Sequence, residues 1–151
     1  MADQFIPKWA IREGWHAVRI ANIEERFGKP GMGWQIKFVV TEGADKKKHG
    51  FDRVWFPVPG SHIRAAQRNR MFFAALGFTP PRKQGYWHRP PKKQDVLGKE
   101  LEIDVRHRWY KTGAAWKLWV TGNFYGFRPI GGLEPIETVE TIAPEDDEVR
   151  F

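Results

Sequence analysis

KELEIDVRHRWYKTGAAWKLWVTGNFYGF, residues 99–127, is the stretch that decides the fold. Apolar side chains recur at every second position on both sides of the turn residues 112–114, which is the period of half-buried β-strands. The alternating positions are Leu101, Ile103 and Val105 before the turn and Trp116, Leu118 and Val120 after it. The stretch therefore predicts an antiparallel hairpin with one face on a hydrophobic core.

Three further strands and one helix are expected upstream of this hairpin. WHAVRIANIEERF at 15–27 is rich in apolar and β-branched residues but has no helical stripe, so we expect a long strand. WQIKFVV at 34–40 and FDRVWFPV at 51–58 both alternate, as half-buried strands do. After Ser61, a good N-cap, apolar residues recur at helical spacing until Gly77 supplies a stop.

The order strand, strand, strand, helix, strand, strand is that of the OB-fold, a five-stranded Greek-key barrel. We therefore predict an all-β protein: residues 1–132 form a five-stranded OB-fold barrel with one helix between strands 3 and 4. The apolar content drops and acids accumulate over 133–151, which predicts a disordered acidic C-terminal tail. GKPGMG at 28–33 is expected to be a hairpin loop, and the proline-rich stretch 78–98 a long connecting loop.

The charge of the chain is divided between these two parts. Residues 133–151 hold seven acids against Arg150 alone, so the rest of the chain carries a net charge of +13. A basic body of this kind is the electrostatic signature of a polyanion binder, although a well-solvated surface is the alternative. Eight Trp, three Tyr and eleven Phe are more rings than one small core readily buries, so several should be exposed.

Composition excludes several classes of site. Cysteine is absent, which excludes disulfides, thiolate metal sites and a cysteine nucleophile and agrees with a reducing cytosol. The five histidines are scattered without the spacing of a zinc site, and no nucleotide-binding or hydrolase motif is present. We expect a cytoplasmic protein with no membrane segment, no cofactor and no bound metal.

A DNA-binding face follows from strand parity. Side chains opposite the apolar positions of their own strands face solvent, and there cations alternate with flat aromatic rings, as a sequence-blind single-strand groove requires. These candidates are Lys37, Arg53, Trp55, Arg106, Arg108, Tyr110, Lys117 and Trp119. The alternative buries Trp55 and Trp119 under the N-terminal lead-in or a partner subunit and leaves the cations as an ordinary solvated surface.

Two weaker sets of candidates lie in loops. Tyr86 and Trp87 stand among basic residues between PPRKQG and PPKK, and we expect this loop to fold over DNA. The alternative is a small satellite cluster packed on the barrel. Phe27 and Lys29 flank the first hairpin loop and are further candidates.

Several segments together resemble the phage-encoded single-stranded DNA-binding proteins of the OB-fold class. They are EGWHAVRIANIEERFGKPGMGWQIKFVVTEG, LGF at the end of the helix, LGKELEIDVRHRWYKTG, WVTGNFYGF and the tail EDDEVRF. The resemblance implies a host-cytoplasmic protein that coats single-stranded DNA in replication and recombination. Tails of that class typically end in acids followed by proline and phenylalanine, whereas here Arg150 precedes the final Phe151.

The tail is expected to recruit partner proteins. A replication or recombination protein with a basic-rimmed apolar pocket would take the ring of Phe151 while its rim pairs with Asp146, Asp147 and Glu148. Two other functions stay open: an RNA-binding module on the same barrel, and a metal-dependent nuclease using Asp52, Glu102 and Asp104. The plainer interpretation of those carboxylates is that they pair with the many cations. The sequence leaves the oligomeric state open.

Overall fold

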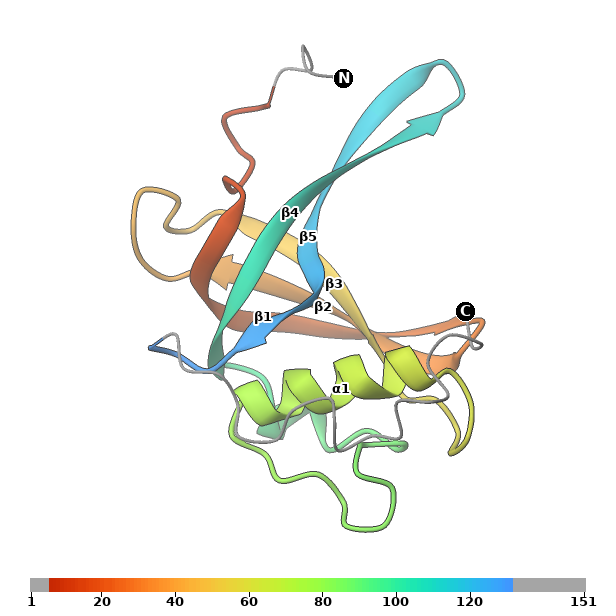
Figure 1. The fold of residues 1–151 in the computed structure, drawn as a ribbon. Coiled ribbons are helices and arrows are strands. Elements are labelled where there is room, and N and C mark those ends of the chain that lie inside the picture. The colour runs from red at the N-terminus through yellow and green to blue at the C-terminus, as the bar shows by residue number, and fades with distance from the viewer. Residues whose placement is uncertain (1–5, 132–151) are drawn as a thin grey trace.

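The computed structural model describes residues 6–131, which are mostly β-strand (Figure 1). The elements in chain order are β1 (Gly14–Gly28), β2 (Gly31–Val40), β3 (His49–Trp55), helix α1 (Ile63–Ala75), a short 3-10 helix η1 (Lys93–Asp95), β4 (Glu100–Thr112) and β5 (Ala115–Arg128). The predicted order of five strands, with the α-helix between the third and fourth, is therefore confirmed. No helix in residues 6–131 is long and apolar enough to cross a membrane.

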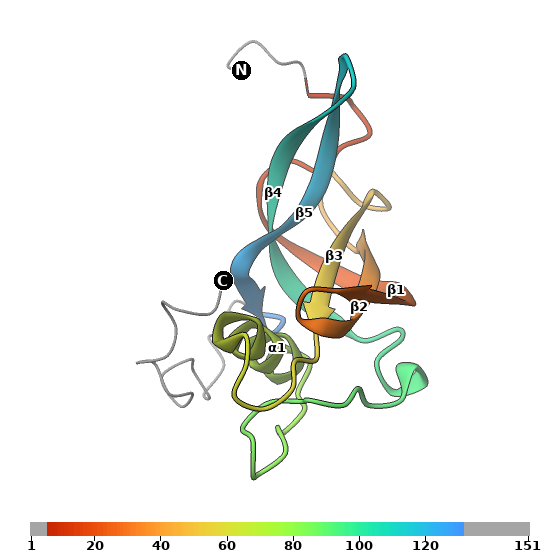
Figure 2. The ribbon, with the colours of Figure 1, turned by 90° about the vertical axis from the view of Figure 1, so that its right-hand side faces the viewer.

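The strands form one antiparallel sheet in the order β3-β2-β1-β4-β5. The long β1 holds the sheet together, because Gly14–Arg19 pair with β4 and Val18–Gly28 pair with β2. Within the described residues β3 and β5 are the two edge strands, so hydrogen-bonded ladders do not close the sheet. Helix α1 lies across one end of the curved sheet, and the β4–β5 hairpin projects from the other end (Figures 1 and 2).

The hydrophobic core lies between the concave side of the sheet and helix α1. The alternation predicted for β4 is confirmed, since Leu101, Ile103 and Val105 are fully buried. Phe72 and Phe73 of α1 cap this core: Phe72 packs edge-to-face on Phe127 with ring centroids 5.2 Å apart. Burial of such apolar side chains contributes roughly 1.5–3 kcal/mol each and is the main stabilising term of the fold.

Helix α1 also ties the two edge strands together. The Arg68 guanidinium lies 2.6 Å from a carboxylate oxygen of Asp52 on β3. It also donates hydrogen bonds to the backbone carbonyls of Arg53 on β3 and Phe124 on β5. The Asp52 carboxylate in turn accepts from the N–H of Gly122 on β5 at 3.2 Å. Side chains therefore bridge β3 and β5 where no strand pairing does.

Two local predictions are corrected by the structure. Ser61 is not the N-cap: the helix starts at Ile63 after His62, whose φ of 47° is left-handed, and the Ser61 hydroxyl donates to the Val58 carbonyl. Trp116 does not face the core and is 47 % exposed. The reason is that the end of the β4–β5 hairpin projects beyond the other strands (Figure 2), and residues 110–117 are all exposed there.

The first hairpin is tighter than the glycine-rich run 28–33 suggests. Gly28 pairs with Gly31, so the turn itself consists of Lys29 and Pro30. Gly33 already belongs to β2, where it lies opposite Trp55 of β3. The helix stop at Gly77 is as predicted, because Gly77 takes a φ of 92° just after the C-cap.

Candidate nucleic-acid interface

A groove of about 770 Å³ opens between β3, β5 and the β4–β5 hairpin. Five of the residues predicted from strand parity line it: Arg53, Trp55, Arg108, Tyr110 and Trp119. A second hollow of about 320 Å³ continues from it toward Lys29 and the start of α1. The two hollows share Arg53, Trp55, Arg68 and Phe124 as walls, so they lie next to each other on the molecule.

Strand register places the β2 and β3 members of this face. Phe51 lies opposite Lys37, and Arg53 lies opposite Gln35, so the four side chains emerge on one side of the sheet. The Arg53 Nε donates to the Gln35 side-chain oxygen at 3.3 Å. Lys37 is thus on the predicted face, beside Phe51, but it does not line the groove itself.

Register also places the β4 and β5 members. The cross-strand partners are Arg108 with Trp119 and Tyr110 with Lys117. Because partners in an antiparallel pair project to the same side, this arrangement brings both cations beside both rings. Arg106 lies on the same side of β4 but forms an ion pair with Asp104 at 2.9 Å, and it does not line the groove.

Trp55 is held flat against the first hairpin. A Cβ atom added at Gly33 would come within 2.3 Å of the Trp55 ring, and one added at Gly28 within 2.8 Å. The two glycines therefore leave the space that the ring occupies. Since Trp55 also lines both hollows, part of its ring surface remains open to a ligand. A ring supported from behind and open in front is suited to stacking on a base.

Trp119 stands at the seam between the edge strands. Its ring stacks on Phe51 with centroids 5.9 Å apart and planes 17° from parallel, and the Arg53 guanidinium carbon lies 5.9 Å from its centroid. His49 packs edge-on to Phe51 at 5.5 Å. Burial, together with the positive charge of Lys37, lowers the pKa of His49, which favours the neutral form of this imidazole.

The charged side chains that line the groove favour the binding of an anion. Its one carboxylate, Asp52, is neutralised by Arg68 and further occupied by two backbone N–H groups. Within residues 6–131 neither Arg53 nor Arg108 forms an ion pair. Both guanidinium groups can therefore bind phosphate oxygens without first breaking a salt bridge.

Tyr86 and Trp87 lie elsewhere. Tyr86 is only 5 % exposed, and its hydroxyl donates to the Pro57 carbonyl at 2.8 Å; burial raises the pKa of Tyr86 to about 12. The Trp87 ring packs on Phe73 at 5.5 Å, and its backbone is held by Asn69. This placement agrees with the alternative of a small cluster packed on the rest of the fold. We therefore leave both rings out of the proposed DNA-binding face.

Sequence reasoning missed Phe51, which stacks on Trp119 beside the groove, and also Arg68 and Phe124, which line the groove. Phe51 has the same parity as Arg53 and Trp55, so the argument that selected those two would also have found it. Phe124 lies within a register shift of the β4–β5 pair, between Gly122 and Phe127, which breaks the alternation on which such an argument depends. Arg68 sits on a helix, where only the tertiary structure shows that it points to the seam.

Each of the carboxylates considered for a nuclease forms an ion pair with an arginine. Asp52 pairs with Arg68, Asp104 with Arg106, and Glu102 with Arg128 at 2.7 Å. In the described part of the chain, no group of three or more acidic or histidine side chains could hold a metal ion.

The predicted partner-binding residues of the tail, Asp146, Asp147, Glu148 and Phe151, lie outside the described residues. Their role stays a prediction. Comparison with known proteins adds no identity: the sequence matches no protein-family profile, and no curated protein matches it.

Proposed function

We propose that this protein binds single-stranded DNA, without sequence preference, along the groove between β3, β5 and the β4–β5 hairpin. The observation that carries the proposal is that the rings of Trp55, Tyr110 and Trp119 and the cations of Arg53 and Arg108 line the same groove. Rings bind the faces that every base has, and guanidinium groups bind the phosphate that every nucleotide has. Neither contact reads sequence.

The groove favours a single strand over a duplex for the same reason. The supported ring of Trp55 offers a flat surface, which a base can use only when it is not stacked and paired within a duplex. Each base stacked on such a ring typically contributes about 1–3 kcal/mol to binding. In a duplex only the phosphates would remain to interact, and binding would be correspondingly weaker.

The proposal includes the fold: we infer that the sheet is the barrel of an OB-fold. Three observations support this inference. The strand order β3-β2-β1-β4-β5 makes β3 and β5 the pair that would complete a barrel. The Phe51–Trp119 stack and the Asp52–Gly122 hydrogen bond bring those edges together. The helix between β3 and β4 covers the end of that seam, and OB-folds commonly bind oligonucleotides.

The cellular role that fits is protection of single strands in replication or recombination, in the cytoplasm of a host cell if the protein is phage-encoded. In this scheme the acidic tail recruits other replication or recombination proteins through Phe151 and the acids before it. The division of charge supports it, because a basic body suits DNA and an acidic peptide suits a basic pocket on a protein.

A salt-titrated binding assay tests the central proposal. Labelled single-stranded DNA, duplex DNA and RNA of matched length and mixed sequence are titrated with the full chain, with and without magnesium. We expect tight binding to single strands of different sequence, weak binding to duplex and a steep loss of affinity with salt. Equal or tighter binding to duplex DNA would refute the proposal that the groove binds single strands. Tighter binding to RNA would reassign the ligand, and cleavage with magnesium would make the protein a nuclease.

A further inference from the structure

The β4–β5 hairpin carries a second aromatic and basic face on its reverse side. In the register of this hairpin, Lys111 lies opposite Trp116 and Trp109 opposite Leu118, on the side away from Arg108 and Tyr110. The two rings stand diagonally to each other, and Trp116 is 47 % exposed. Large rings exposed beside cations, away from the core, are typical of interaction surfaces.

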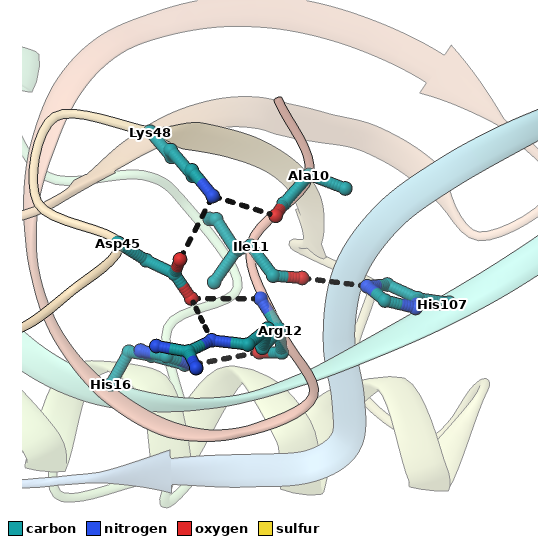
Figure 3. Close-up of polar contacts among 7 residues, drawn as sticks. All are labelled: Ala10, Ile11, Arg12, His16, Asp45, Lys48 and His107. Carbon is teal, nitrogen blue, oxygen red and sulfur yellow. Dashed lines mark hydrogen bonds and ion pairs between the residues drawn. The ribbon is translucent and has the colours of Figure 1, made fainter. Parts of the chain in front are cut away.

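A hollow of about 450 Å³ lies on this reverse side, between the N-terminal lead-in and β4. Its walls include Ile6, Arg12, His107 and Trp109. The lead-in is fixed in place, because the His107 ring bonds the Ile11 carbonyl at 2.6 Å (Figure 3). The lead-in therefore forms a fixed wall of this hollow, opposite the wall that β4 forms.

Buried Asp45 anchors the other side of the lead-in. Figure 3 shows the Asp45 carboxylate between Lys48 and Arg12: it accepts from the Arg12 backbone N–H at 2.9 Å and lies 3.2 Å from its Nε. The Arg12 side chain is still 68 % exposed, so its outer N–H groups can reach a ligand. The one acid lining the hollow, Glu13, is engaged by the backbone N–H of His107 at 2.8 Å.

Trp109 connects this hollow to the proposed DNA groove, because it lines both. A strand that leaves the groove past Tyr110 thus meets a continuous surface that leads over the hairpin. The continuity and the positive charge of Arg12 and Lys111 favour a polyanion as the occupant over an apolar protein surface.

We propose that single-stranded DNA leaving the groove wraps over the β4–β5 hairpin and makes a second set of contacts on its reverse face. There a base stacks on Trp116 and phosphates bind Lys111 and Arg12. The inference rests on the proposed function, since it extends the same path. It means that the length of strand bound by one protein is set by both faces of the hairpin, and not by the groove alone.

The test compares short and long oligonucleotides. Strands of about 6 and about 16 nucleotides fall within the range that single OB-folds occupy, and only the longer should reach the reverse face. We expect Trp116→Ala and Lys111→Ala to weaken binding of the longer strand about 5- to 100-fold and to leave the shorter strand unaffected. Lys111→Ala should also make binding of the longer strand less dependent on salt, by the amount expected for the loss of about one phosphate contact.

Two controls make the outcomes separable. Trp119→Ala, in the groove, should weaken binding of both the short and the long strand. Trp15 of β1 is an exposed ring beside Arg128 of β5, and Trp15→Ala should weaken binding of neither strand. If wild-type protein binds neither strand, the proposed function itself fails. If it binds both and the reverse-face variants match it at both lengths, only this inference is overturned. Equal weakening at both lengths overturns it too, as does a change in oligomeric state with DNA affinity retained.

Discussion

Arg68 of helix α1 forms a buried ion pair with Asp52 of β3, at 2.6 Å and with both side chains 8 % exposed. The same guanidinium reaches the backbone of β5 through the Phe124 carbonyl, and its carbon lies 4.5 Å from the centroid of the Phe127 ring. One side chain thus joins the helix to both edges of the sheet. Because the groove runs along this seam, the pair positions the proposed DNA-binding residues as well as stabilising the fold.

Removing the cation should leave a buried charge without a partner. Arg68→Met is expected to lower the free energy of unfolding by about 3–5 kcal/mol, because Asp52 would remain desolvated and unpaired. Urea denaturation at pH 7 measures this change. The double variant Arg68→Met with Asp52→Leu should recover much of the loss, since it removes both charges. Arg26→Met, which breaks the exposed Arg26–Glu24 pair, is the matched control and should cost about 1 kcal/mol or less.

The second prediction concerns the support of Trp55. Gly33→Ala places a methyl group where the ring lies, within 2.3 Å of its atoms, so the ring must move away from the hairpin. We expect single-stranded DNA affinity to fall by about 1–3 kcal/mol, as it would for Trp55→Ala, because each change removes the same stacking surface.

A double-mutant cycle checks that interpretation. If Gly33→Ala acts only through the ring, it should weaken DNA binding no further in a protein that already carries Trp55→Ala. Additive losses would mean that the glycine matters for another reason, such as the twist of the hairpin. Thermal unfolding of each variant separates a displaced ring from a damaged fold.

The alternation of side chains along the strands predicted much of the fold and part of the proposed DNA-binding face. The element order and the buried positions Leu101, Ile103 and Val105 could be predicted because a strand with one buried face must alternate. The same rule placed Arg53 and Trp55 in the groove. It failed for Trp116, because alternation gives the side of a strand but not the point at which the strand leaves the core.

Contacts between distant segments were beyond such reasoning. Tyr86 and Trp87 were expected at a DNA surface, yet Tyr86 is buried with its hydroxyl on the Pro57 carbonyl. Trp87 is half-buried against Asn69 and Phe73 of α1, which no local pattern connects to this loop. Arg68 could equally have been a solvated helix residue. The arrangement at the seam is tertiary, and it is set by the close approach of β3 to β5 at Gly122, where a Cβ would come within 2.5 Å of Asp52.

The third prediction is a pH dependence set by Asp45. Burial acts to raise the pKa of Asp45, but hydrogen bonds from the Arg12 backbone N–H, Lys48 and the Arg12 side chain outweigh it and hold the pKa at about 2. The folded pKa lies below the ordinary value of 3.8, so folding favours the carboxylate. The resulting stabilisation, about 2 kcal/mol, is complete above roughly pH 4 and is lost as the pH falls through 2.

Asp45→Asn removes this titration. The variant should be less stable than wild type at pH 7, and the difference should shrink toward pH 2, as measured by urea denaturation across that range. Glu24→Gln, which removes a carboxylate from an exposed ion pair, is the control and should cost about 1 kcal/mol or less at pH 7. A difference between Asp45→Asn and wild type that is constant from pH 7 to pH 2 would show that the carboxylate does not supply the stabilisation.

The last prediction concerns the acidic segment 133–151, whose seven acids can compete with DNA phosphates for Arg53, Arg108 and the other cations of the groove. Deleting residues 134–151 should therefore preserve or tighten binding to single-stranded DNA, and most clearly at low salt, where such charge competition is least screened. Phe151→Ala keeps every acid, so it should leave DNA affinity unchanged while abolishing recruitment of replication or recombination proteins in a pull-down. DNA titrations of the three forms at fixed salt accompany the pull-down. A truncated protein with weaker DNA binding would assign the segment to the binding site itself. Recruitment that survives Phe151→Ala would show that the terminal ring is not the group that the partner binds.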